Sequence, residues 1–378
     1  MTRPVAVLLL AALVGPARGE LEVLEFPAAP AAEAAPAMAL ILLSEATDDA
    51  PVAAPAPNRT PEVPAQDAYA TPAAAQAADV GSRPPAGGRA GLAVGLRQDR
   101  LLWHIAADMS GTATPNVLSE LEWTQVRLLG INGHVDWPLA GSLDLGARMG
   151  VGFVVDGRNR DSDWLDDDRN NEFSRSYADV RGHGALDLAL ELAWRLPGRE
   201  GSHLAPLLGY AWQSLHLNGR NGHQTIAPVT DDDGNYLGGT PVDADFTQTL
   251  DSTYEASWQG PYLGLAGELA AGAWRLSGRI ERHHSDYRAE ADWNLRDDFA
   301  HPVSFQHRGE GRGWRLATEL EWRRADGLRF TLGLSGRRFR LDNGTDQIYF
   351  SDGSSSVTRL NQVKWRSAEL QLGLRYAW

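Results

Sequence analysis

The sequence has 378 residues, a formal net charge of −14 and no cysteine. The acidic charge argues against a nucleic-acid-binding surface, which would be basic, and the lack of cysteine excludes disulfides and thiolate metal sites. The mean hydropathy of −0.33 is too polar for a bundle of membrane helices. A membrane barrel can be that polar, because half of each strand faces its interior and its loops are hydrophilic.

Residues 1–19 have the parts of a secretory signal peptide. Arg3 precedes an apolar run from Val5 to Val14, and a small-x-small cleavage site ends at Gly19. The apolar run is too short to span a bilayer. We expect cleavage after Gly19; the alternative is the start of a buried helix.

Residues 20–90 are dominated by alanine and proline, as in the segment 50–57. A segment of this composition has little apolar surface to bury. We therefore predict a disordered linker over 20–90, ahead of a barrel domain over 91–378.

From residue 91 onward, apolar side chains recur at every second position. The period is clearest in the last ten residues, at Leu370, Leu372, Leu374, Tyr376 and Trp378. It recurs at 186–194, 274–280, 314–322 and 328–334. A period of two indicates strands with one apolar and one polar face, and several of these runs carry tryptophan at one end. We predict an all-β fold: an antiparallel transmembrane β-barrel of about ten strands, with lipid against its outer wall.

The connections between these strands alternate in length. Short turns are expected at 138–141, 197–202, 271–272 and 325–327. Long, polar and mostly acidic loops are expected at 109–117, 159–175, 221–252, 293–309 and 343–356. Short turns on one side and long extracellular loops on the other are typical of barrels in the outer membrane of Gram-negative bacteria. The alternative is a soluble β-sandwich or solenoid.

Two aspartates in the second long loop are candidates for chemistry. On an extended segment Asp161 and Asp163 point the same way, and two adjacent carboxylates raise each other's proton affinity. Such a couple can orient a water or accept its proton. A solvated acidic loop is the simpler interpretation. A calcium loop fails, because Asp166 replaces the required glycine, so we expect no metal and no cofactor.

Three stretches of the chain resemble the omptins, a family of outer-membrane proteases with ten-stranded barrels. The segment 118–123, continued through 133–139, is similar to the second omptin strand and its turn. Residues 161–166 resemble the omptin Asp-x-Asp-Trp-Met-Asp motif, and 260–265 resembles Pro-Tyr-Ile-Gly-Leu of the sixth strand. The order and spacing of the three stretches fit, and the likeness covers about 90–378.

The resemblance implies a site in which Asp161 and Asp163 face an Asp-x-His dyad across a cleft, with a water activated between them. The dyad positions fall on Asn294 and Arg296, and no Asp-x-His occurs within 280–310. Asparagine cannot accept a proton and arginine stays protonated, so the general base of the family is missing there. Asp292 matches an omptin aspartate that lines the pocket for the basic residue before the scissile bond.

Other histidines flank this loop and could replace the missing base: His283, His284, His301 and His307. The simpler interpretation is that they are ordinary loop or lumen residues. Omptins also depend on lipopolysaccharide, held by a Tyr-x-Glu-x-Arg motif. The matching stretch here begins at Tyr210, but Trp212 and Ser214 replace the acid and the base.

Three functions remain open. The first is a non-peptidase descendant with an acidic extracellular cleft, binding basic peptides or host surface proteins. The second is an active aspartic endopeptidase that cleaves at basic residues, with a displaced histidine as base. The third is a structural barrel or a narrow pore. We expect the lumen of a ten-stranded barrel to be largely filled by side chains, which argues against a wide channel.

Overall fold

The computed structural model describes residues 87–246, 250–324 and 328–378, almost all of them in strands. The predicted signal peptide and nearly all of the predicted linker lie outside these residues. The strands are β1 (Arg89–Ile105), β2 (Ser119–Ala140), β3 (Leu143–Asp166), β4 (Asn170–Val180), β5 (Gly184–Trp194), β6 (Ser202–Thr230), β7 (Tyr236–Phe246), β8 (Thr253–Ala271), β9 (Trp274–Asp292), β10 (Phe305–Arg323), β11 (Arg329–Tyr349) and β12 (Ser355–Ala377). A short 3-10 turn, η2 (Asp167–Arg169), joins β3 to β4. In the described part of the chain, no helix is long and apolar enough to cross a membrane.

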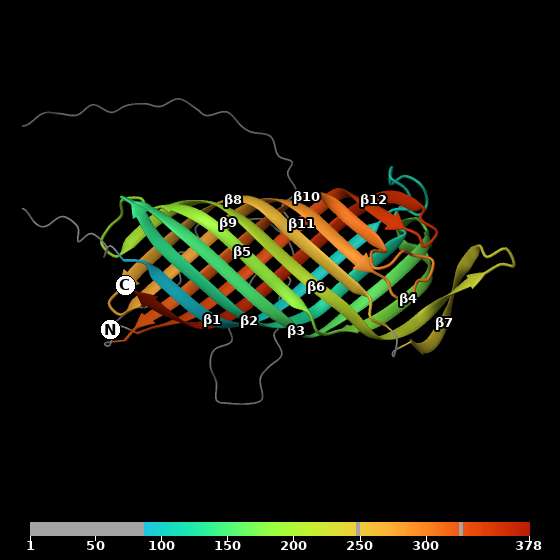
Figure 1. Cartoon of the computed structure of the whole chain (residues 1–378), viewed down its shortest axis with the longest axis horizontal. Coiled ribbons are helices and arrows are strands. Elements are labelled where there is room, and N and C mark those ends of the chain that lie inside the picture. Colours follow the sequence, from blue (N-terminus) through green and yellow to red (C-terminus); the bar gives the residue numbers. More distant parts are fainter. Residues whose placement is uncertain (1–86, 247–249, 325–327) are drawn as a thin grey trace, which may run out of the picture. The chain divides into compact units, whose positions relative to one another are not determined.

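The strands close into one antiparallel barrel (Figure 1). β1 pairs with β2 on one side and with β12 on the other, so the first and last strands complete the ring. β4 and β5 follow one another in the same place between β3 and β6, and together they make one interrupted strand of the wall. Within the described residues β7 pairs only with β6 and stands outside the ring. The ring therefore has ten positions, which confirms the predicted ten-stranded barrel.

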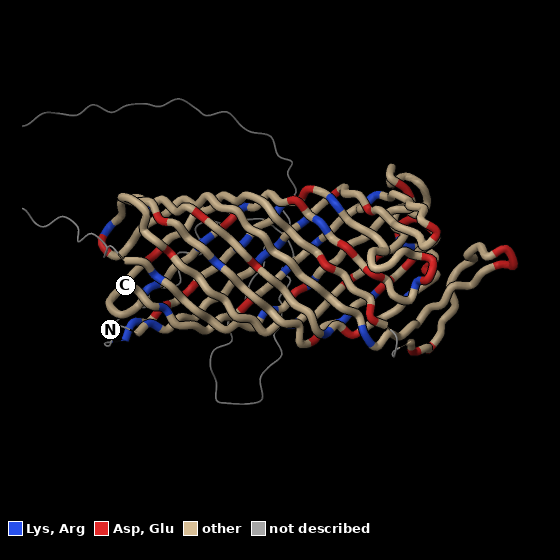
Figure 2. The backbone as a smooth tube through the Cα atoms, in the orientation of Figure 1, with Lys and Arg blue, Asp and Glu red and all other residues tan. Residues whose placement is uncertain are grey.

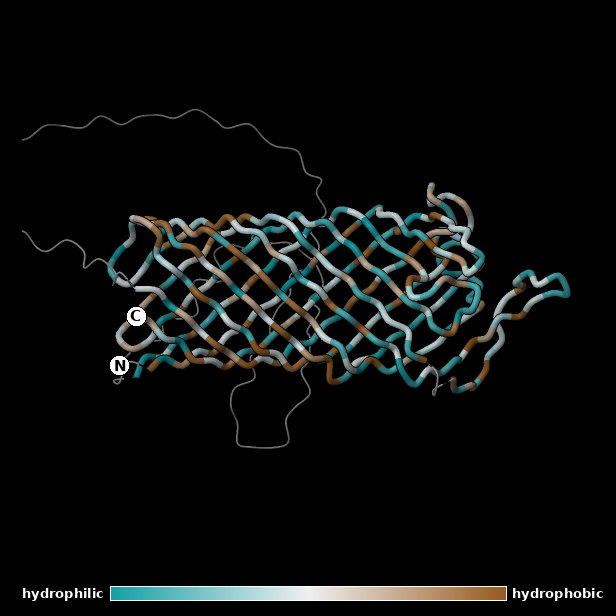
Figure 3. Tube along the Cα trace, in the orientation of Figure 1, coloured by the Kyte–Doolittle hydropathy of each residue, from teal (hydrophilic) through white to brown (hydrophobic). Residues whose placement is uncertain are grey.

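The outer wall carries the apolar side chains of the period-two pattern. Leu188, Leu332 and Leu372 are 37%, 39% and 59% exposed. Aromatic rings gather at the short-turn end, where Trp137 and Trp378 lie 5.9 Å apart. In Figure 3 the tip of the hairpin of β6 and β7, at the opposite end, is hydrophilic in colour. An apolar wall with an aromatic border belongs against lipid, which confirms the predicted outer-membrane barrel.

Three of the predicted long loops are mostly strand. β3 and β4 occupy most of 159–175, β6 and β7 most of 221–252, and β11 and β12 most of 343–356. Above the membrane both faces of a strand can be polar, so the side-chain pattern no longer marks the strand, while the backbone pairs as before. The barrel therefore stands well above the lipid.

The lumen has two zones, and β1 shows the change between them. Its inward residues are charged at Arg97 and Asp99, and then apolar at Leu101, Trp103 and Ile105. The zone near the long connections is a packed apolar core to which every position of the ring contributes. The zone near the short turns is ionic and contains a cavity of about 250 Å³.

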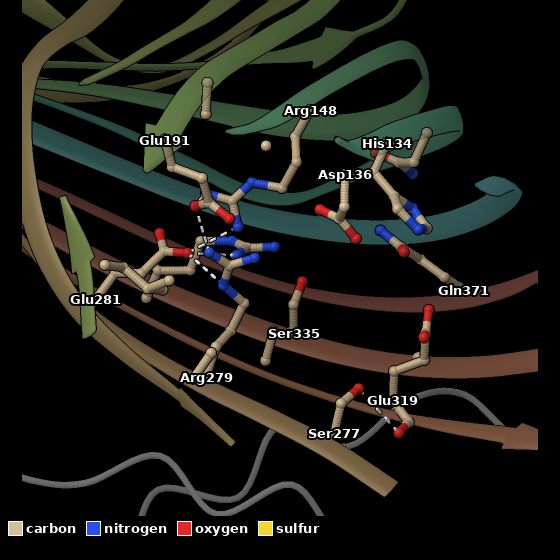
Figure 4. A pocket seen from close by; sticks show the side chains of 18 of the residues that line it. His134, Asp136, Arg148, Glu191, Ser277, Arg279, Glu281, Glu319, Ser335 and Gln371 are labelled. Carbon is tan, nitrogen blue, oxygen red and sulfur yellow. Dashed lines mark hydrogen bonds and ion pairs between the residues drawn. The ribbon is translucent and has the colours of Figure 1, made fainter. Parts of the chain in front are cut away.

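Figure 4 shows part of the ionic zone, where arginines surround two buried glutamates. Arg148 donates to Glu281 over 2.8 Å, and Tyr262 donates to Glu191 over 2.5 Å. Among the candidate residues of the sequence analysis, His283 lines this cavity, whereas Asp161, Asp163, Asp292, Asn294 and Arg296 do not. The predicted site therefore has to be sought at the other end of the barrel.

Candidate functional site

Asp161 and Asp163 lie on the lumen face of β3, near its extracellular end. They pair with Leu121 and Ser119 of β2, and Leu121 is buried in the apolar core. The exposed apolar side chains of β3 end at Val155. The couple begins six residues later, roughly 20 Å further along the strand, and so lies outside the membrane. The structure thus places the two carboxylates on the same face of the strand, as the alternation of an extended segment predicts.

Hydrogen-bond donors meet the couple, and Glu172 adds a negative charge that acts on Asp163. The Trp293 side chain donates a hydrogen bond to Asp161, and the hydroxyls of Ser119 and Ser174 donate to Asp163. Arg296 supplies a nearby positive charge that acts on both carboxylates. We call Asp161, Asp163, Trp293 and Arg296 the rim cluster.

The surroundings of the couple favour protonation. Burial raises the pKa of Asp161 well above its usual range, and the neighbouring Asp163 raises it further, against the opposing effect of Arg296. Burial also raises the pKa of Asp163 to about 6, although hydrogen bonds from Ser119 and Ser174 and the charge of Arg296 act the other way. One Asp161 oxygen, Oδ1, is buried without a hydrogen-bond partner among the described residues. Two coupled carboxylates of this kind share their protons.

The two positions that depart from the omptin dyad brace the loops. Asn294 Oδ1 accepts hydrogen bonds from the Asp251 backbone N–H at 2.9 Å and the Ser252 hydroxyl at 3.0 Å. Arg296 donates two hydrogen bonds to Asp298, both of 2.9 Å. Asn294 therefore ties the segment before β8 to the segment after β9, and Arg296 is held in place beside the couple.

Asp292 forms a pair that the sequence does not reveal. His301 Nδ1 and Asp292 Oδ1 are 2.5 Å apart, joined across the β9–β10 connection. The side chains on either side of Asp292 along the chain, Ala291 and Trp293, pack into the apolar core. Alternation along the strand then turns Asp292 to the outer face, away from Asp161 and Asp163. The Asp–His pair and the Asp couple thus lie on opposite faces of the wall.

The other candidate histidines are dispersed. His283 is buried in the ionic zone, 3.0 Å from Glu281, and His284 is exposed on the outer wall. His307 is fully buried in the apolar core, with Asp346 at 3.3 Å and the Tyr254 hydroxyl at 3.0 Å. His307 and Asp346 come from predicted loop segments, and nothing in the spacing of the sequence indicates that they meet.

The rim around the cluster is strongly acidic (Figure 2). Residues 161–168 include five aspartates, residues 221–251 include six, and neither stretch contains lysine or arginine. Tyr236 at the start of β7 stacks on Phe173 of β4, with ring centroids 4.7 Å apart. The β6–β7 hairpin is therefore attached to the wall that carries the couple.

Comparisons with known proteins agree with this architecture. A family model described as "Protochlamydia outer membrane protein" matches residues 91–378. No curated protein matches the chain. The crystal structure of the outer membrane protease OmpT from Escherichia coli is similar, with a TM-score of 0.65 and 14% identity over 79% of this chain and 99% of that chain. The translocator domain of the autotransporter NalP from Neisseria meningitidis has a TM-score of 0.32 and 11% identity over 79% and 90%. The likeness to OmpT confirms the predicted omptin-like barrel, and at this identity it concerns the fold alone.

Proposed function

The chain belongs to the family described as Protochlamydia outer membrane protein, and we propose that it is a surface barrel whose rim cluster binds positively charged peptide segments without cleaving them. The observation that carries the proposal is the set of groups around the couple. Asp161 and Asp163 are met by an indole, two hydroxyls and a guanidinium. None of these groups can act as a general base, so the couple is left without a partner for catalysis, and an ionised carboxylate there can pair with a cation.

The charge of the rim supports a basic ligand. The aspartates of 161–168 and 221–251 give the extracellular end a negative potential, which attracts cations and speeds their association. A lysine or arginine side chain of a peptide can reach the couple and take the place of Arg296, which keeps Asp298 as its partner. The ligand class therefore follows from charge and from hydrogen-bonding capacity.

Catalysis of the omptin type would require a second proton acceptor, facing the couple and within hydrogen-bond reach of the attacking water. Neither Asn294 nor Arg296 can act as that base. Asp292 and His301 form a pair of the right type, but alternation places Asp292 on the other face of the wall. Binding without turnover is therefore the function that this geometry favours.

The test measures binding and turnover on the same refolded protein. A dibasic fluorogenic peptide is added with and without lipopolysaccharide, and fluorescence anisotropy of a labelled copy reports binding. We expect saturable binding without cleavage, weakened in the double variant D161N/D163N and retained in D352N, which changes an exposed aspartate of the β11–β12 turn. Heat-modified migration on gels confirms that each variant is folded. Equal binding by wild type and the double variant would overturn the proposal.

One observation favours an active endopeptidase as the second candidate. The 2.5 Å contact between Asp292 and His301 supplies an Asp–His pair on the same rim as a carboxylate couple of raised pKa. A movement of the β9–β10 connection would be needed to turn this pair toward the couple. Turnover in the same assay that disappears in both D163N and H301A would establish the enzyme and remove the binding-only proposal.

A further inference from the structure

The β6–β7 hairpin extends beyond the rim of the barrel (Figure 1). The first half of β6 pairs with β5 and β8, and its last third pairs with β4 on one edge and with β7 on the other. β7 itself pairs only with β6 in the described residues. β7 therefore presents one edge of backbone N–H and C=O groups on which a further strand can form.

The side chains of β7 leave this edge accessible. No residue of β7 is buried, and Tyr236 and Leu237 are 50% and 61% exposed. The strand is nevertheless anchored, since Tyr236 stacks on Phe173 and the Cβ position of Gly239 lies 2.6 Å from the Glu172 carbonyl oxygen. An anchored strand with an open edge loses little conformational freedom when a partner pairs with it.

The charge of the hairpin selects the partner. Asp243 and Asp245 lie two residues apart on the same face of β7, and both contact His223 of β6, over 3.4 Å and 2.7 Å. Their side chains remain 94% and 70% exposed. A second copy of the hairpin has aspartates but no lysine or arginine within 221–246, so it offers no complementary charge to Asp243 and Asp245. A basic segment offers that complementary charge and is therefore favoured over a second copy.

We propose that the free edge of β7 takes up an extended basic peptide as an additional strand, with lysine or arginine at alternate positions opposite Asp243 and Asp245. Backbone hydrogen bonds then hold the segment, and the spacing of the two aspartates selects its sequence. This inference rests on the proposed function for the ligand class. To the proposed function the inference adds a second subsite on β7. It also specifies an extended conformation for the bound segment and the spacing of the segment's charges.

The first experiment compares two labelled peptides of identical composition on the full-length protein in detergent. One has lysine and threonine strictly alternating, and the other has its lysines in one block. Strand addition predicts tighter binding of the alternating peptide. Neutralising the edge in D243N/D245N should weaken that peptide roughly two- to thirtyfold. It should leave the block peptide nearly unchanged, and D352N serves as the matched control.

The second experiment tests the backbone directly. Two isomers of the alternating peptide are N-methylated at every second residue, one at the lysines and the other at the threonines. In a strand, alternate N–H groups point to opposite edges, so only one isomer can still donate to β7. One isomer should bind like the parent peptide and the other should lose most of its affinity. Equal affinities of the two isomers would overturn strand addition. This experiment uses only the wild-type protein, so it does not depend on whether the variants fold.

The outcomes separate this inference from the proposed function. If D161N/D163N weakens binding while the two N-methylated isomers bind equally, the rim cluster is a binding site and the β7 edge is not. If the two isomers differ in affinity while D161N/D163N binds like wild type, the β7 edge is the binding site, and the proposal that the rim cluster binds the peptide is wrong. If neither peptide binds, both proposals fall.

Discussion

At the scale of single residues, the behaviour of the rim cluster depends on the protonation of Asp163. Its pKa of about 6 lies above the ~3.9 of an unperturbed aspartate, so the folded protein holds this proton more tightly than the unfolded chain. The contribution of Asp163 to stability is therefore largest at low pH and declines between about pH 4 and pH 6. Binding of a cation changes in the opposite direction, because only the ionised carboxylate attracts it.

The first prediction is a loss of peptide affinity on acidification. At pH 5 only about a tenth of a group with a pKa near 6 is ionised, so the Kd of a lysine peptide should rise about tenfold between pH 7.5 and pH 5. Anisotropy titrations at both pH values measure it. In D161N/D163N the affinity should be weak and nearly independent of pH; a pH dependence that persists unchanged would assign the titration to other groups.

The second prediction concerns Arg296, whose charge competes with a cationic ligand. Removing it in R296Q should tighten peptide binding at pH 8 by about 1.5- to 5-fold, corresponding to roughly 0.2–1 kcal/mol for a partly exposed pair. R296K keeps the charge and should bind like wild type, as should R312Q on the outer wall. Weaker binding by R296Q would mean that Arg296 helps to build the site.

Residue types in the sequence were sufficient to find the couple but not its surroundings. Asp161 and Asp163 share a face because extended backbone alternates, which is a local rule. The contact between Asp292 and His301 depends on how a connection of a dozen residues folds back, and the contact between His307 and Asp346 depends on the pairing of two strands. Non-local contacts of this kind leave no spacing in the sequence.

At the scale of elements, Asn294 joins the connection before β8 to the connection after β9. It does so from the position that a catalytic aspartate occupies in the omptin motif. The third prediction is that N294A removes the acceptor for Asp251 and Ser252 and speeds amide hydrogen exchange at 250–253. The local cost is about 1 kcal/mol for the lost hydrogen bonds. N294D keeps an acceptor oxygen and should restore protection. Unchanged exchange in N294A would show that other contacts hold these connections.

Strands were predictable where they cross lipid and not where they rise above it. The apolar alternation of 314–322 and 328–334 reflects one face toward lipid, and β10 and β11 contain these runs. The upper part of β6 and the whole of β7 mix polar residues, glycine and proline with a few apolar residues, so their pattern is that of loops. The interruption between β4 and β5 likewise has no signal in the composition of 181–183.

At the scale of the whole barrel, a charged side chain placed on the lipid-facing outer wall should destabilise the fold. The fourth prediction is that L372R, on the outer face between Leu332 and Val94, destabilises the folded barrel in lipid vesicles by about 2–4 kcal/mol near the bilayer midplane. Urea unfolding followed by tryptophan fluorescence measures the change. S354R, in the exposed β11–β12 turn, should have little effect, and equal stability of L372R and wild type would contradict the membrane placement of this strand.

The fifth prediction concerns transport. Trp103, Tyr254, Phe339 and Trp365 fill the apolar zone together with other apolar side chains, and every position of the ring contributes. Such a layer holds no continuous column of water, so we expect no steady ionic current when the protein is inserted in planar bilayers. Regular conductance steps would contradict this packing and would favour the narrow-pore interpretation.

The seam between β1 and β12 also has a consequence for how the protein is made. Arg89 at the start of the wall lies beside Ala377 at its end, and seventeen residues of β1 find partners in β12. β12 is synthesised after the other eleven strands, so one edge of β1 has no partner until β12 has been made. A polypeptide that lacks β12 leaves backbone N–H and C=O groups unpaired along both β1 and β11, so closure of the barrel depends on the last of these strands to be synthesised.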